Sequence, residues 1–344
     1  MMSDNWFCFM EKTFDNAIID QPKVILHTHL EGSVPGGVLE LLSRRNNVPL
    51  SFEPSATNIS PIIETHNWNS FRKVYYEICS CFVNGIDFYD SLLAYGKKLC
   101  RENVIYAEIQ FSPWKHISRN VSVASISEAL IDAIEDLEAT HGITIRIITD
   151  LVRHKDEDCD SILDWLRDAP RKYFVGLGIS GGANAVPRKL YKPYCHRAKD
   201  MGLRITSHAG EIEDSTSVRE VIDYWNTDRI GHGVGCIENA ELLDEVISKR
   251  IHCEICPTAN RIVGLATSYN DPIRNFIEAG VNFSINPDDE FIFRTNITHE
   301  LNELASNGLL QAQDITNMQK NALVDSFLDT DLRNDLIQEY FSGN

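Results

Sequence analysis

Short apolar runs that end in polar residues recur along the chain. Eight of them are rich in β-branched residues, and most are almost continuously apolar, as strands are when both faces of a parallel sheet are covered. These runs occupy residues 24–30, 104–112, 144–152, 174–180, 203–209, 228–234, 251–257 and 281–287. The pattern therefore predicts eight buried strands.

Helical patterns lie between most of these strands. Residues 125–142 carry apolar side chains at helical spacing and end on a glycine, and residues 239–250 and 271–280 follow a similar scheme. Repeated alternation of strand and helix predicts an α/β fold, namely a (β/α)8 barrel of the TIM type. In such a barrel the active site lies at the carboxyl ends of the strands.

Two regions depart from strict alternation. Residues 31–103 separate the first strand from the second and are far longer than an ordinary connection. They contain helical stretches at 68–85 and 87–103, so we expect a helical insertion over the active-site mouth. Residues 315–341 predict extra C-terminal helices outside the barrel. Because no repeat or linker divides the chain, we expect one barrel domain over residues 1–344.

The composition limits the partners. Hydrophobic residues make up 43% of the chain, as in a globular core, and the formal net charge of −18 argues against nucleic acid or an anionic membrane. No apolar run approaches the roughly 20 residues that span a bilayer, and the first residues lack the features of a signal peptide. We therefore expect a cytoplasmic protein that acts on a small molecule. The sequence is compatible with a monomer and with a homo-oligomer.

Nine cysteines are spread through the chain. An odd number without a secretion signal favours reduced thiols over a disulfide scaffold. Cys253 and Cys256 form a C-x-x-C pair, but residues three apart on a strand point to opposite faces. For this pair we expect core packing rather than a zinc or redox site.

Four metal-binding side chains fall at the ends of different predicted strands. His27 and His29 are two apart on the first strand and share a face, His208 ends the fifth strand, and Asp288 follows the eighth. A barrel gathers such strand ends at one mouth, and three imidazoles with one carboxylate suit zinc or a similar ion. The pattern predicts a site for one zinc or a similar divalent ion, with packed or exposed histidines as the alternative.

Three more polar residues accompany these strand ends. Glu211 follows His208 in HAGE and is a candidate general acid, although the dipole also favours glutamate at a helix N-terminus. His232, between two glycines at the sixth strand, is a candidate catalytic or ligand-orienting residue. Asp289 diverges from Asp288 and can face the substrate, unless the pair is only a polar turn.

Six stretches occur in a fixed order along nearly the whole chain, and they are HTHLEGS, GISGG, SHAGE, DRIGHGV, CPTANRIVG and INPDD. Together they resemble the adenosine deaminase family of metal-dependent amidohydrolases. H-x-H or HAGE alone would be weak evidence, but the ordered set is highly specific. The resemblance implies a zinc-dependent hydrolase of purine metabolism, which acts on a C–N bond of adenosine or a related 6-aminopurine nucleoside or base.

The resemblance also implies a role for each site residue. Zinc on the four predicted ligands activates water, and the hydroxide attacks C6 with release of ammonia. His232 holds that hydroxide and stabilises charge, and Glu211 gives a proton to N1 of the purine. Asp289 bonds N7 and the backbone at Gly181 meets N3. The implied substrate contacts are His29, Glu31, Gly181 and Asp289.

Some positions depart from the family pattern. Glu31 stands where adenosine deaminases usually carry an aspartate that contacts the ribose, and glutamate there is more like the adenine deaminases. Glu290 stands where the family usually has proline, and Gln110 where many relatives have arginine. Adenine or a modified aminopurine is therefore the alternative substrate.

Short motifs offer rival interpretations. Residues 178–182 match G-x-S-x-G with Ser180 as a nucleophile, but prolines interrupt the helix that should follow. His252 and Glu254 match the H-x-E of other zinc deaminases, but no cysteine follows Cys256, which excludes that class. A metal-bearing, non-catalytic purine-binding protein is a further alternative, and the combined presence of a candidate acid and a hydroxide-positioning histidine argues against it.

Overall fold

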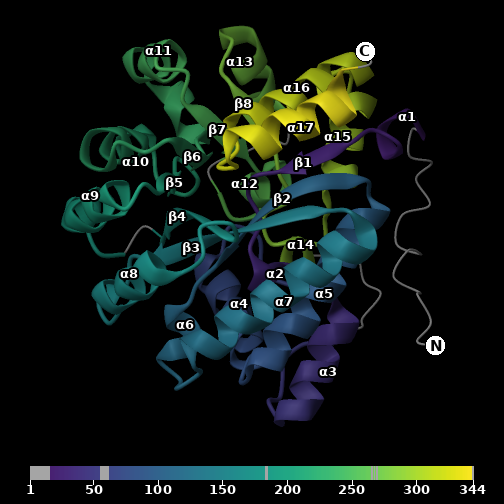
Figure 1. The fold of residues 1–344 in the computed structure, drawn as a ribbon. Helices are drawn as coiled ribbons and strands as arrows, with labels where there is room; N and C mark the ends of the chain where they lie inside the picture. Colours follow the sequence, from purple (N-terminus) through teal and green to yellow (C-terminus); the bar gives the residue numbers. More distant parts are fainter. Residues whose placement is uncertain are drawn as a thin grey trace.

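Eight parallel strands form one sheet in sequence order, from β1 to β8 (Figure 1). The computed structural model describes residues 16–54, 62–182, 185–264, 266, 268 and 270–342. The strands span β1 Lys23–Ile25, β2 Val104–Phe111, β3 Thr144–Val152, β4 Phe174–Ser180, β5 Arg204–Ala209, β6 Arg229–His232, β7 His252–Ile255 and β8 Phe283–Ile285.

The sheet curls into a nearly closed barrel. Each strand pairs in parallel with the next one along the chain, and a parallel bridge joins Thr28 to Asp288, just beyond the ends of β1 and β8. This confirms the predicted (β/α)8 architecture. Most strand positions are buried because both faces of the sheet are covered.

All eight predicted strands are present, but the prediction for the first was too long. β1 ends at Ile25, and the segment that carries the two histidines continues outside the ladder. Its backbone N–H groups at Leu26 and His27 donate to Oδ1 of Asn286, at 2.8 and 3.1 Å. A side chain thus replaces the neighbouring strand as the hydrogen-bond partner, which no pattern of apolar residues reveals.

Helices surround the barrel, with α7 as the clearest example. Ser122 caps its first turn, Gly142 ends it in the left-handed conformation, and its apolar face is buried. The helices that follow β2 to β7 are α6 Trp114–Ile117, α7 Val123–His141, α8 Cys159–Asp168, α9 Lys192–Asp200, α10 Ser215–Glu220, α11 Ala240–Ser248, α12 Pro257–Ile262 and α13 Asp271–Ala279, with 3₁₀ segments at Arg188–Tyr191 and Val234–Glu238 and a π segment at Val221–Trp225.

The region between β1 and β2 is helical. It holds α2 Leu30–Ser33, α3 Gly36–Asn46, α4 Trp68–Ser80 and α5 Gly85–Arg101, and residues 55–61 of the predicted insertion lie outside the described residues. Helix α5 packs along α7, while α4 contacts α2, α6 and α14. This places α4 beside the carboxyl ends of the strands.

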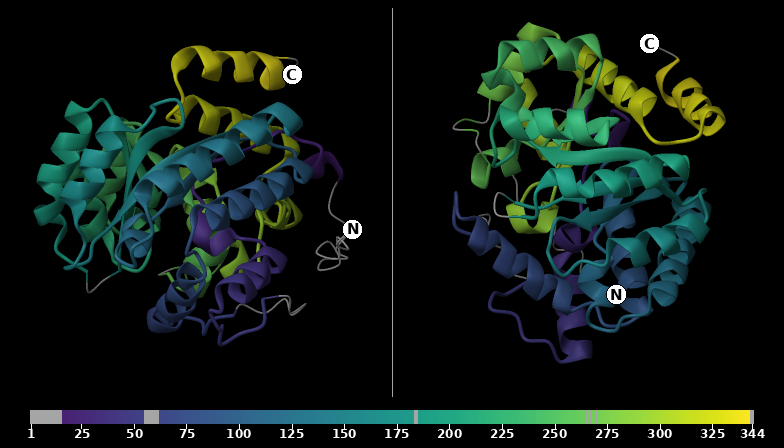
Figure 2. Two further views of the ribbon diagram at one scale, coloured as in Figure 1. Left: turned by 60° about the horizontal axis from the view of Figure 1, so that its bottom comes forward. Right: turned by 90° about the vertical axis from the view of Figure 1, so that its left-hand side faces the viewer.

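The chain finishes in helices, of which the first contacts α2 and α4 at the carboxyl ends of the strands and the last two lie at the other end of the barrel (Figure 1). They are α14 Glu290–Phe293, α15 Ile297–Ser306, α16 Ala312–Asp325 and α17 Thr330–Phe341, and the short α1 spans Asn16–Ile19. In Figures 1 and 2, α16 and α17 lie on the side of the molecule opposite α3 and α4. The ring of Phe327, just after α16, lies 3.6 Å from the Arg229 guanidinium, and its backbone N–H donates to Glu108. The C-terminal segment therefore covers the amino-terminal end of the barrel.

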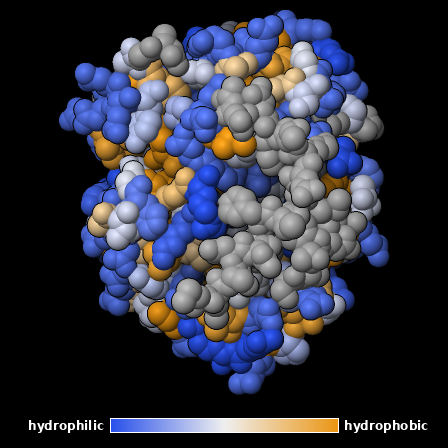
Figure 3. All heavy atoms as spheres, turned by 90° about the vertical axis from the view of Figure 1, so that its right-hand side faces the viewer, coloured by the Kyte–Doolittle hydropathy of each residue, from blue (hydrophilic) through white to orange (hydrophobic). Residues whose placement is uncertain are grey.

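On the face in Figure 3 the coloured side chains are mostly hydrophilic, and the hydrophobic ones form small separate groups. Within the described part of the chain, no helix combines the length and apolarity needed to cross a bilayer. The eight cysteines in that part are unpaired, and Cys253 and Cys256 are buried in the core.

Candidate active site

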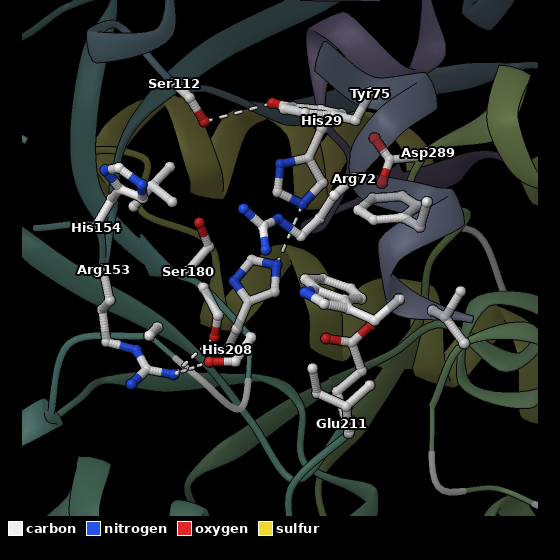
Figure 4. Close-up of a pocket in the computed structure, with 18 of the residues that line it drawn as sticks. His29, Arg72, Tyr75, Ser112, Arg153, His154, Ser180, His208, Glu211 and Asp289 are labelled. Atoms are coloured by element: carbon white, nitrogen blue, oxygen red, sulfur yellow. Dashed lines mark hydrogen bonds between the residues drawn. The ribbon is translucent and has the colours of Figure 1, made fainter. Parts of the chain in front are cut away.

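A cavity of about 640 Å³ opens at the carboxyl ends of the strands. This volume lies in the range of small-molecule sites, roughly 300–1,000 Å³. Histidines and carboxylates from the strand ends form its floor, and α4 with the segments after β3 and β4 forms its walls. Figure 4 shows His29 and His208 facing each other, with Glu211 and Asp289 on one side and Ser180 on the other.

The four predicted metal ligands lie together on this floor. Nε2 of His29 is 3.2 Å from Nε2 of His208 and 3.4 Å from Oδ1 of Asp288. Nε2 of His27 is 3.7 Å from the same Oδ1, and its ring centroid is 4.6 Å from that of His208. Residues from opposite ends of the chain therefore point their donor atoms at one small volume.

The chemistry of these donors fits a divalent metal ion. Burial, followed by the charge of His27, lowers the pKa of His29 and of His208 well below the usual value, so both rings are neutral and two unprotonated nitrogens can face each other. Nε2 of His27 is buried without a hydrogen-bond partner. Neutral imidazole nitrogens beside a carboxylate are a donor set that zinc prefers.

Hydrogen bonds set the tautomer of His27. Its Nδ1 lies 2.8 Å from Oε2 of Glu254, and a carboxylate can only accept, so Nδ1 carries the proton and Nε2 presents a lone pair to the site. Burial alone would lower the pKa of His27, but the bond to Glu254 and the charge of Asp288 raise it. Glu254 is held in turn by Arg229 at 2.5 Å.

His232 has the opposite tautomer. Oδ1 of Asn260 accepts from the backbone N–H of Cys256, so the amide nitrogen of Asn260 is the atom that donates to Nδ1 of His232 at 3.0 Å. Nε2 of His232 therefore carries the proton and is a donor, which suits a residue that holds an oxygen rather than a metal. The sulfur of Cys256 lies within 4.8 Å of donor atoms of His232 and Asp288.

The backbone is strained at two of these residues. His232 and Asp288 adopt left-handed conformations, with φ of 64° and 62°. The Asp288 carbonyl accepts from the hydroxyls of Thr28 and Ser33, at 2.8 and 3.1 Å, which holds this conformation. In this backbone conformation both side chains line the cavity.

Two predicted catalytic acids border the same floor. Oε2 of Glu211 is 3.6 Å from Nε2 of His232, and Oδ1 of Asp289 is buried without a hydrogen-bond partner. Burial, and then the charge of Asp288, raise the pKa of Glu211 and of Asp289 well above the usual values. Both side chains line the cavity, so each can meet a bound ligand.

Of the other two predicted substrate contacts, Gly181 lines the cavity and Glu31 does not. The Gly181 carbonyl accepts from the Arg153 guanidinium at 2.7 Å. Oε1 of Glu31 accepts from the Ser112 backbone N–H at 3.1 Å and bonds Nε2 of His116 at 2.9 Å. Substrate contact by Glu31 stays a prediction.

Several residues at the site have roles that were not predicted from the sequence. They are Glu254, Asn260, Arg153 and Asp150. A carboxylate inside the apolar strand at Glu254 was a usable signal, because a buried charge needs a partner. Ser180, the rival nucleophile, donates to Asp150 at 2.5 Å, and burial raises the pKa of that aspartate to about 7. In the described structure no histidine bonds Ser180, which removes the basis of a serine mechanism.

Comparison with known proteins places this barrel and its site among the hydrolases that act on carbon–nitrogen bonds. The profile of the family described as adenosine deaminase matches residues 22–341. The chain therefore belongs to the adenosine deaminase family, as its motifs predict. A curated relative is the adenine deaminase of Hahella chejuensis, which is 29% identical over 310 residues and aligns over 89% of this chain and 92% of its own.

Solved structures share the fold. Adenine deaminase from Arthrobacter aurescens superposes with a TM-score of 0.84 at 24% identity, over 93% of this chain and 98% of its own. An amidohydrolase from Burkholderia ambifaria with bound Zn gives the same TM-score of 0.84 at 22% identity, over 94% and 91%.

Proposed function

We propose that this protein is a metal-dependent hydrolase that deaminates a 6-aminopurine and holds one Zn²⁺ per chain. The observation that carries the proposal is the convergence of three imidazoles and one carboxylate beside an acid and a donor histidine. The proposed ligands are His27, His29, His208 and Asp288. A bound ion of this kind lowers the pKa of water toward neutrality and so supplies a nucleophile at working pH.

The chain's own residues position the reacting atoms. Nε2–H of His232 donates to the attacking oxygen and stabilises its charge. The protonated carboxyl of Glu211 donates to N1 of the purine as the oxygen adds to C6. The proton of the attacking oxygen then passes through these residues to the amino group at C6. The C6–N6 bond breaks, ammonia leaves, and a 6-oxopurine remains.

Other residues orient the ring. Asp289, whose pKa is raised by burial and by the charge of Asp288, donates to N7 in its protonated form, and the backbone at Gly181 meets N3. His29, next to Asp288, borders the ring on the floor side. We propose that the insertion of residues 31–103 covers this site through α4, because α4 supplies Trp68, Phe71, Arg72, Tyr75 and Tyr76 to the cavity wall.

Adenine, as the free base or as part of a nucleoside, is the ring that we propose the site recognises. The curated relative carries the name adenine deaminase, and the family resemblance makes Glu31 more like the adenine deaminases than the adenosine deaminases. The bonds from Glu31 to Ser112 and His116 hold its carboxylate behind the wall, so we propose that it shapes the pocket and leaves the substituent on N9 to other groups.

Ammonia release over a substrate panel tests the proposal. Zinc-loaded protein is incubated with adenine, adenosine, deoxyadenosine, AMP and N6-modified aminopurines. We expect turnover of at least one of them, loss of turnover after treatment with a strong chelator, and recovery on addition of Zn²⁺. Full activity of metal-free protein, or no ammonia from any aminopurine, would refute it.

Metal content offers a second test. We expect His208→Ala to bind much less zinc than the parent protein, as measured by elemental analysis after dialysis. His196→Ala, which removes an exposed histidine on α9, is the matched control and should keep the full content. Equal zinc in the two variants would remove His208 from the ligand set.

A further inference from the structure

Four basic side chains gather at the outer part of the cavity. Arg72 comes from α4, Lys115 from α6, and His154 and Lys155 from the segment after β3, and all four line the cavity. We name them the mouth cluster. In a chain whose formal net charge is −18, such a concentration of positive charge is unexpected on composition alone.

The members of the mouth cluster lie close to one another. Nζ of Lys115 is 3.2 Å from the hydroxyl of Tyr76 and 4.5 Å from the centre of its ring. The guanidinium carbon of Arg72 is 5.6 Å from the same ring centre. Burial and the charges of Lys115, Arg72 and Lys155 lower the pKa of His154, which places His154 within reach of all three.

The cluster has little compensating negative charge. Over the described ranges, Arg72, Lys115 and Lys155 form no ion pair, and Oδ2 of Asp156 lies 3.7 Å from Nδ1 of His154. Arg45, by contrast, is paired with Asp87 and Asp90. Like charges held together without counter-charges repel, so a bound anion would be attracted there.

The position of the cluster matches one part of a substrate. The floor is buried, whereas Arg72, Lys115 and His154 are half-buried and Lys155 is exposed. In the proposed function, C6, N1 and N7 face the floor, so N9 points toward the mouth. Figure 4 shows the Arg72 side chain pointing into the pocket and His154 on the opposite wall.

We infer that the mouth cluster binds the phosphate of a 6-aminopurine nucleotide, so that a nucleoside 5′-monophosphate is preferred over the nucleoside and the free base. This inference rests on the proposed function and adds the substituent that it leaves open. Arg72 and Lys115 donate charge-assisted hydrogen bonds to phosphate oxygens, and the Tyr76 ring keeps the two cations apart. The cavity volume of about 640 Å³ leaves space beyond a flat base for a ribose and a phosphate.

Kinetics with matched substrates test the inference. With zinc-loaded protein, kcat/KM for AMP should exceed that for adenosine by about tenfold or more, the size expected of charge-assisted contacts. Arg72→Gln and Lys115→Gln should each lower kcat/KM for AMP by about tenfold, mainly through KM, and leave that for adenine within about twofold. Lys320→Gln removes an exposed lysine on α16 and is the charge-matched control, with no change expected for either substrate.

Binding measurements provide a readout that is independent of turnover. In calorimetric titrations, the product nucleotide IMP should bind more tightly than hypoxanthine, and the difference should shrink in Arg72→Gln and Lys115→Gln. Equal kcat/KM for AMP and adenosine, with no selective loss in either variant, would overturn the inference and leave the deaminase proposal intact. No ammonia from any aminopurine would overturn both.

Discussion

The carboxylate of Glu254 accepts a hydrogen bond from Nδ1 of His27 at 2.8 Å, deep inside the barrel. This bond fixes the tautomer of His27 and makes its Nε2 a stronger donor to a metal. In Glu254→Gln the charge is lost, so we expect zinc affinity to fall by about 10–100-fold. Competition with a calibrated chelator measures the affinity. Glu241→Gln, on the exposed face of α11, should leave it unchanged, and an unchanged affinity in Glu254→Gln would contradict the assignment.

Asn260 controls the other tautomer. Its amide donates to Nδ1 of His232, so Nε2 keeps the proton. In Asn260→Asp the new carboxylate accepts from Nδ1, which moves the proton off Nε2 and removes the donor that faces the attacking oxygen. We expect kcat to fall by about 100-fold while zinc is retained. A fall of this size is typical when one hydrogen-bond donor to a developing oxyanion is removed. Nitrogen-resolved NMR of the histidine rings would show whether the tautomer has changed, and normal kcat after such a change would remove His232 from the reaction.

Glu211 is the proposed proton donor to N1. Glu211→Gln keeps the size of the side chain but cannot transfer a proton, so turnover should drop by about 10²–10⁴-fold. Zinc content and the affinity for the product should stay near those of the parent protein. Steady-state kinetics with elemental analysis separate the two effects. A near-normal rate would mean that another group protonates N1.

The barrel could be predicted from the sequence because its strands are buried on both faces. Runs such as 144–152 and 174–180 match the observed β3 and β4, since each is apolar and ends in a turn. The end of the first strand could not be predicted. Asn286, which is distant in the sequence, accepts the backbone hydrogen bonds of Leu26 and His27 in place of a neighbouring strand. The contact of Phe327 with Arg229 was hidden for the same reason, since it joins the C-terminal segment to a strand.

The candidate ligands could be predicted because they sit at strand ends, where a barrel collects side chains. Their supporting residues were not predicted, although the buried charge of Glu254 inside an apolar strand gave a signal. Glu254 and Asn260 act through hydrogen bonds that cross between strands and helices, and such pairs leave no spacing signal in the sequence. The mouth cluster was also hidden, because Arg72 and Lys155 are remote in sequence and meet only when α4 lies beside the end of β3.

Gly32 leaves room for Asp289. A Cβ atom added at Gly32 would lie 1.6 Å from Oδ1 of Asp289, so Gly32→Ala must displace that carboxyl group. We expect kcat/KM to fall by about 100-fold, as for other misplacements of about 1 Å, with zinc content unchanged. Asp289→Asn provides the comparison, because both variants disturb the contact to N7. Unaltered kcat/KM in Gly32→Ala would show that Asp289 does not position the ring.

Asp325 links the C-terminal segment to the barrel and gives a pH-dependent contribution to stability. Burial alone would raise its pKa, but hydrogen bonds from His252 at 2.9 Å and Asn282 at 2.8 Å lower it below the ordinary 3.8. Because the folded pKa lies below the unfolded one, the unfolded chain binds more protons at acid pH. The stabilisation is therefore complete above pH 3.8 and is lost as the pH falls below it.

Asp325→Asn should thus lower the free energy of unfolding by about 1–3 kcal/mol at pH 7, since hydrogen bonds to a charged group are lost. The difference from the parent protein should shrink as the pH falls below 3.8 and through the lower pKa of the folded protein, where the parent carboxylate becomes protonated. Urea denaturation at a series of pH values measures this difference. Asp335→Asn, on the exposed side of α17, should differ little from the parent at every pH. A difference between Asp325→Asn and the parent that stays constant down to the lowest pH would show that the charge of Asp325 does not stabilise the fold.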